Sequence, residues 1–176
     1  MFVLVIVLCA GCADKKTDLS GDRPVKPAEF LAAFPELSLP ISVADTNINK
    51  RADTAIIGYK ALQQFFPDSV LVELFGKDTR QVIHPVGKIQ KGKDAEIYLL
   101  LNSTNRKKAT RLGVFVVDKK LAFKAAKKLI TNDINDGYTH LLTINREPTF
   151  MIGRERSSRS PHVANVSREG ESGKAE

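Results

Sequence analysis

The 176-residue chain contains no tryptophan and few aromatic residues of other kinds. Large stacking platforms for sugars or bases are therefore not favoured, because such surfaces need aromatic rings. Only two cysteines are present, Cys9 and Cys12, and both lie within the first dozen residues. This count excludes a disulfide framework and a cysteine-rich zinc site for the rest of the chain.

The N-terminus carries the only long apolar run, MFVLVIVLCA over residues 1–10. This run is too short to span a bilayer, which takes about 20 apolar residues. It has the length of the apolar core of a secretory signal, and the small residues Ala10 and Gly11 follow it, just before Cys12. A buried N-terminal strand that contains two cysteines is the alternative, as is a redox or metal CxxC pair.

The segment LCAGC, residues 8–12, resembles the lipobox of bacterial lipoproteins, in which small residues precede a cysteine. Cys9 stands where that family usually has leucine, and no basic residue precedes the apolar run. The resemblance implies a signal peptide over residues 1–11, cleavage between Gly11 and Cys12, and a lipid on the Cys12 thiol. It also implies a lipid-anchored protein of the cell envelope, in the outer rather than the inner membrane.

The positive charge of the chain is concentrated in one stretch. The net charge is +7, yet residues 88–128 alone hold 12 basic side chains against three acidic ones. Several of these cations fall in predicted turns, where lysine commonly keeps a turn solvated. Because alternate turns of a meander lie at the same end of the sheet, Lys91, Lys93, Lys119 and Lys120 are expected at one end and residues 106–108 at the other. The functional alternative is electrostatic contact with anionic lipid headgroups, lipopolysaccharide phosphates or an acidic envelope protein. The candidate anion-binding residues are Lys91, Lys93, Arg106, Lys107, Lys108, Lys119 and Lys120.

The body of the chain is predicted to be a small α+β domain over residues 28–154, with short N-terminal helices followed by an antiparallel β-meander. Helices are expected at 28–34, 59–66 and 69–75, because good helix formers there end at Pro35, Pro67 and Gly76. A half-buried edge strand is expected at 37–43, where apolar residues alternate. The segment 44–55 has the composition of a loop.

Strands are expected from residue 81 onwards. Apolar and β-branched runs separated by short turns favour antiparallel hairpins. Residues 121–130 suit either a strand or an amphipathic helix, and we favour the strand. The predicted strands are 81–90, 95–102, 111–118, 121–130, 138–146 and 149–154.

Polar segments flank this body on both sides. Residues 12–27 are charged and contain glycine and proline, so they are expected to form a flexible tether. Residues 155–176 are rich in Ser, Gly, Arg and Glu and are expected to be a disordered tail. Because the tail follows a strand abruptly, we expect that the domain is incomplete and that the tail is a truncation or frameshift product.

The stretches FLAAFPELSLP and YKALQQFFPDSVLVELFG, with the strands after them, resemble uncharacterised envelope lipoproteins of diderm bacteria. These are packing motifs, so the resemblance implies an address and an architecture and no activity.

No catalytic or metal-binding motif is recognisable. The three histidines, His84, His140 and His162, have no second ligand at metal spacing, and no nucleophile elbow or phosphate loop is present. We therefore predict no cofactor, no metal, no nucleic acid and a non-catalytic binding or structural role. The alternatives are a lipid-anchored hydrolase with an unrecognised active site and a truncated fragment without independent function.

Overall fold

The centre of the molecule is a four-stranded antiparallel meander. The computed structural model describes residues 18–50, 55–90, 92, 96–133 and 136–156. The strands follow one another in the sheet in chain order, joined by short turns. They are β2 (Val82–Gln90), β3 (Ile97–Thr104), β4 (Thr110–Val117) and β5 (Phe123–Thr131). The assignment of the ambiguous segment to a strand, β5, is therefore confirmed.

A second antiparallel sheet has the order β1-β6-β7. Strand β1 (Ile41–Ala44) pairs with β6 (Tyr138–Ile144), so that Ile41 lies opposite Ile144, and β7 (Phe150–Arg156) forms the other edge. The prediction of a single meander is wrong at this point, since the final hairpin leaves the first sheet to pair with β1. The class α+β with antiparallel strands agrees with the structure.

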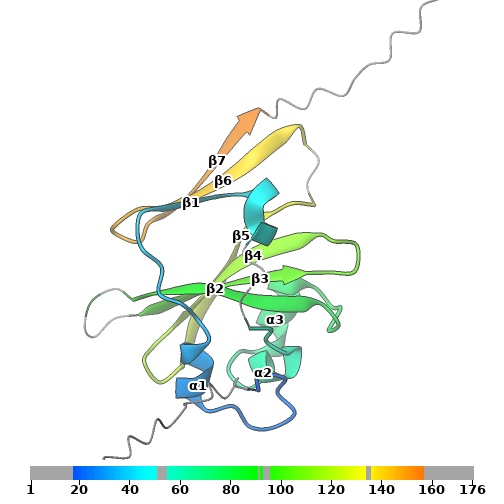
Figure 1. Ribbon diagram of the computed structural model, residues 1–176, viewed down its shortest axis with the longest axis vertical. Helices are drawn as coiled ribbons and strands as arrows, with labels where there is room; N and C mark the ends of the chain where they lie inside the picture. The colour runs from blue at the N-terminus through cyan, green and yellow to red at the C-terminus, as the bar shows by residue number, and fades with distance from the viewer. Residues whose placement is uncertain (1–17, 51–54, 91, 93–95, 134–135, 157–176) are drawn as a thin grey trace, which may run out of the picture.

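Within the described residues, three short helices lie on one side of the first sheet, and the second sheet lies on the other (Figure 1). The helices are α1 (Pro27–Ala32), α2 (Tyr59–Gln63) and α3 (Asp68–Phe75). Helix α3 ends at Gly76, whose φ of 92° is in the region that favours glycine. The prediction that helices precede the strands is not supported, because β1 and the 3₁₀ helix η1 (Asp45–Lys50) lie between α1 and α2.

Strand β3 is buried on both faces, which explains its nearly continuous apolar sequence. Its residues Ile97, Leu99 and Leu101 pack with the helices, and Leu100 packs with the second sheet. The first sheet therefore separates two apolar clusters.

The segment before α1 is folded against the core. Leu19 and Val25 are buried in the cluster on the helix side, and the Val25 amide donates to Gln64 Oε1 at 2.8 Å. This differs from the expected tether over residues 12–27, because two apolar side chains in a polar segment are enough to dock it. Residues 12–17 of that tether lie outside the described residues.

The predictions for the tail and for the signal peptide concern residues that lie partly or wholly outside the described chain. The expected tail begins within β7, which runs to Arg156, and residues 157–176 lie outside the described residues. The signal peptide and Cys12 lie outside them as well. Among the helices of the described chain, none has both the length and the apolar composition needed to cross a membrane.

Candidate anion-binding site

The predicted cationic residues fall at opposite ends of the first sheet. Arg106, Lys107 and Lys108 lie in the β3–β4 turn, and Lys119 and Lys120 lie in the β4–β5 turn. The β3–β4 register runs from Thr104 opposite Thr110 to Ile97 opposite Val117, so the two turns are one strand length apart. Lys91 and Lys93, predicted at the end of Lys119, lie outside the described residues.

The rest of the basic stretch is dispersed. The half-buried Lys88 donates to the Leu31 carbonyl, and Lys124 forms an ion pair of 3.4 Å with Glu96. Lys127 and Lys128 are exposed on β5, an edge strand of the described sheet. Lysines on an edge strand oppose unwanted strand pairing, which is a structural role. The stretch is therefore not a single basic face.

The β3–β4 turn is held by the side chain of Asn105. Its Oδ1 accepts the backbone amides of Lys107 at 2.9 Å and Ala109 at 3.0 Å. Lys108 has a φ of 61°, a left-handed conformation that closes the turn. Asparagine is neutral, so the turn presents three exposed cations and contains no acidic residue.

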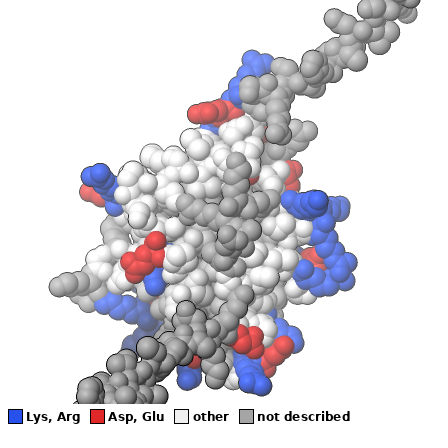
Figure 2. All heavy atoms as spheres, in the orientation of Figure 1, with Lys and Arg blue, Asp and Glu red and all other residues white. Residues whose placement is uncertain are grey.

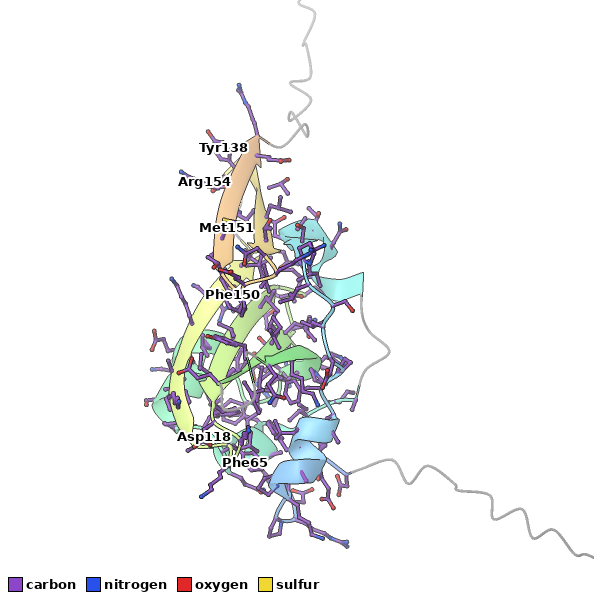
Figure 3. The ribbon with its side chains drawn as sticks, turned by 90° about the vertical axis from the view of Figure 1, so that its left-hand side faces the viewer. Phe65, Asp118, Tyr138, Phe150, Met151 and Arg154 are labelled. Carbon is purple, nitrogen blue, oxygen red and sulfur yellow. The ribbon has the colours of Figure 1, made fainter. Side chains whose placement is uncertain are left out.

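The β4–β5 turn has the same hydrogen bonds with a different charge. Asp118 Oδ1 accepts the backbone amides of Lys120 and Ala122, each at 2.8 Å, and Leu121 has a φ of 63°. The Ala122 amide, followed by that of Lys120, holds the pKa of Asp118 below its ordinary value of 3.8. This turn, marked by Asp118 at the lower end of Figure 3, therefore carries its own anion among the lysines.

A hollow of about 440 Å³ opens beside the β3–β4 turn. Basic side chains gather on this right-hand side of the molecule in Figure 2, with acidic ones among them, where the β3–β4 turn projects in Figure 1. The lining of the hollow combines two of the predicted cations with residues of β4 and of the segment just after β5. Its polar lining consists of Asn105, Lys107, Lys108, Arg111, Asn132 and Asp133.

Arg111 is the fixed cation of this hollow. Its Nη1 donates to the Phe75 carbonyl at the end of α3 at 2.9 Å, and its Nη2 lies 3.4 Å from Asp133 Oδ2. The hydroxyl of Thr131, which donates to the same carboxyl, and then the charge of Arg111 lower the pKa of Asp133 despite partial burial. The one carboxylate in the hollow is thus already engaged.

Two carboxamides complete the polar lining. The Asn132 Oδ1 accepts the Thr110 amide at 2.6 Å, and the Asn105 Oδ1 accepts two amides of its own turn. Since both oxygens are engaged, the group that each side chain retains for a ligand is its Nδ2 donor. Neither Lys107 nor Lys108 has a carboxylate within ion-pair distance among the described residues.

The sequence identified only part of this lining. The turn cations were identifiable because lysine and arginine cluster between two predicted strands. Arg111 was counted in the basic stretch without being assigned to a site. Nothing in the sequence marks Asn132 and Asp133 as part of a site, because only the pairing of β4 with β5 brings them to the turn.

A second polar cluster surrounds His140 on β6. Its Nδ1 lies 3.1 Å from Asp45 Oδ2 and its Nε2 lies 3.4 Å from Asp136 Oδ2. Both ring nitrogens of His140 therefore face carboxylates. Within the described ranges, no group of three or more histidine, cysteine or acidic side chains is arranged to hold a metal ion.

Compared with protein-family models, with curated proteins and with solved structures, the chain has no significant match in any of the three sets.

Proposed function

We propose that this protein is a lipid-anchored lipoprotein of the cell envelope with a non-catalytic binding role. A lipid on Cys12 holds it at a membrane, and the β3–β4 end of the first sheet contacts anionic envelope components. The N-terminal part of the proposal rests on the lipobox-like residues 8–12. The binding part rests on the side chains around the β3–β4 turn.

The observation that carries the binding role is the difference between two turns with the same hydrogen bonds. Lysines that serve only to solvate a turn are equally suited to both. In the β4–β5 turn, however, Asp118 partly neutralises them, whereas Asn105 in the β3–β4 turn makes the same bonds without a charge. The β3–β4 turn therefore contains no anion of its own and lies next to a hollow.

The membrane anchor is tested by replacing Cys12 with serine in the full chain. A thioether to lipid needs the thiol, so the variant should lose the mass of the lipid and remain unprocessed before residue 12. Intact-mass measurement and membrane fractionation check both effects. A Cys12→Ser protein that has the same mass as the parent, apart from the substitution, and the same membrane fraction contradicts the anchor.

The anionic contact is tested by partitioning the full chain between buffer and vesicles. Each lysine near an anionic surface contributes about 1 kcal/mol, so Lys107→Ala with Lys108→Ala should weaken binding to anionic vesicles roughly 30-fold. The apolar N-terminus is common to all variants, so the ratio of anionic to neutral phosphatidylcholine vesicles removes its contribution.

The matched control for this experiment is Lys119→Ala with Lys120→Ala, which removes the same charge from the corresponding turn. We expect it to change the anionic-to-neutral ratio only a few-fold, because long-range attraction is screened beyond about 10 Å at 0.1 M salt. Equal losses for the two double variants mean that net charge alone determines binding, which contradicts a site at the β3–β4 end.

A further inference from the structure

The hollow beside the β3–β4 turn contains a fixed guanidinium group, which a diffuse basic patch does not need. Attraction to an anionic surface needs only solvated ammonium groups, such as those of Lys107 and Lys108. Arg111 is different, because its side chain is only 30% exposed and is fixed at both Nη atoms by the Phe75 carbonyl and Asp133. A positioned guanidinium recognises the geometry of an oxyanion as well as its charge.

The net positive charge of the lining matches a ligand that carries two negative charges. Asp133 neutralises Arg111 through their ion pair, which leaves the charges of Lys107 and Lys108 uncompensated among the described residues. A phosphate monoester carries a charge of about −1.5 to −2 at pH 7, whereas a diester carries about −1. A monoester therefore matches the two lysines, and a diester leaves one of them without a partner.

The neutral donors fit the same ligand. A phosphate monoester has three terminal oxygens that accept hydrogen bonds. Asn105 and Asn132 each retain an Nδ2 amide, and Arg111 has N–H groups beyond the two bonds that fix it. The hollow of about 440 Å³ is larger than a phosphate group alone, so it also has space for the glycerol or sugar that bears it.

We propose that this hollow binds a phosphate monoester, with Lys107 and Lys108 balancing its charge and Arg111 and the two asparagine amides orienting its oxygens. This inference deepens the proposed function and rests on it. The monoester can come from a lipid headgroup or from a free phosphorylated sugar or glycerol, since the two share the group that is recognised.

The test compares vesicles that contain phosphatidic acid, a monoester, with vesicles that contain phosphatidylglycerol, a diester, at equal surface potential. We expect the full chain to bind the phosphatidic acid vesicles on the order of tenfold more tightly, the effect of one or two additional charge-assisted hydrogen bonds. Equal binding to the two vesicles excludes a lipid headgroup as the monoester. Together with no binding of free glycerol 3-phosphate, it overturns the monoester inference and leaves the charge-based function in place.

Arg111→Lys separates oriented recognition from charge. It retains the positive charge and loses the planar fork, so it should reduce the preference for phosphatidic acid to about twofold or less while binding to phosphatidylglycerol stays within about twofold. Thermal melting establishes that the variant is folded. A preference equal to that of the parent chain overturns the role of Arg111 and with it the oriented site.

Free glycerol 3-phosphate distinguishes the two sources. In calorimetric titration of the full chain in zwitterionic micelles, saturable binding that Lys107→Ala with Lys108→Ala abolishes supports a free phosphorylated ligand. Preference for phosphatidic acid vesicles without binding of glycerol 3-phosphate supports a lipid headgroup. Absence of both responses contradicts the proposal for either source.

Discussion

The two turns at the ends of the first sheet differ in one side-chain group, the amide of Asn105 in one turn and the carboxylate of Asp118 in the other. The side chains of Asn105 and Asp118 both accept two backbone amides through Oδ1, so either residue satisfies the turn. The remaining group is a neutral amide in one turn and a carboxylate oxygen in the other. The choice of residue therefore changes the local charge without changing the fold.

Asp45 is a buried acidic residue. Its Oδ2 accepts the His140 amide at 2.8 Å and lies 3.1 Å from His140 Nδ1, and the side chain is only 7% exposed. Asp45→Ala leaves the part-buried His140 amide without an acceptor and removes the polar partner of the ring nitrogen Nδ1, so we expect a loss of about 2 kcal/mol in unfolding free energy. Urea unfolding measures this loss.

Asp136→Ala is the control for that substitution, because it removes the more exposed carboxylate 3.4 Å from the other ring nitrogen. Its effect should be less than half as large. If Asp136→Ala costs as much as Asp45→Ala, the assignment of Asp45 as the principal partner of His140 is wrong.

Asp133 makes a pH-dependent contribution to stability. Its pKa in the folded chain is below the ordinary 3.8, chiefly because the Thr131 hydroxyl donates to the carboxylate. The stabilisation is therefore complete above about pH 5 and is lost as the pH falls through the lowered folded-state pKa. Asp133→Asn should accordingly flatten the decline in melting temperature below pH 4.

Circular dichroism melting of the parent chain and the Asp133→Asn variant between about pH 2.5 and about pH 7 measures this effect. This range brackets the ordinary aspartate pKa of 3.8. The Asp118→Asn variant tests another lowered carboxyl pKa in an exposed turn and serves as a reference. A decline as steep in Asp133→Asn as in the parent chain contradicts the contribution of Asp133.

At the scale of elements, the strands and helices were predictable because each carries a local signal. Alternation, apolar runs and turn residues give all four strands of the first sheet, and Pro67 and Gly76 mark the ends of α3. The pairing of β1 with β6 had no such signal. About 100 residues separate the two strands, and a four-residue edge strand does not specify its partner.

Strand β2 depends on Gly87 for its contact with the segment before β1. A Cβ at this position would lie 2.4 Å from Leu37 Cγ and 2.8 Å from the Pro35 carbonyl oxygen. That carbonyl accepts the Lys88 amide at 2.8 Å, so it has little freedom to move. Gly87→Ala should therefore destabilise the chain by about 1–3 kcal/mol, as overpacking does.

Gly153→Ala in β7 is the matched control, since the nearest atom to a Cβ there is the Leu141 carbonyl oxygen at 4.0 Å. This variant should be neutral or slightly stabilising because alanine lowers the entropy of the unfolded chain. Chemical denaturation of both variants tests the pair. Equal stability of the two contradicts close packing at Gly87.

At the scale of the whole molecule, two apolar clusters on opposite faces of the first sheet hold the helices and the second sheet in place. The meander then fixes which turns share an end of that sheet. The sequence alone predicts that the β3–β4 and β4–β5 turns lie at opposite ends of the sheet. The hollow could not be predicted, because Arg111, Asn132 and Asp133 meet only through strand register and through the carbonyl of Phe75.

The most direct test of the account exchanges the two turn residues, Asn105→Asp with Asp118→Asn. The double variant keeps the net charge of +7 and an Oδ1 acceptor in each turn, and it moves one carboxylate to the β3–β4 end. We predict roughly fivefold weaker partitioning to anionic vesicles, the effect of cancelling one cation at the contact. Partitioning equal to or stronger than that of the parent chain would contradict an anion-binding site at the β3–β4 turn.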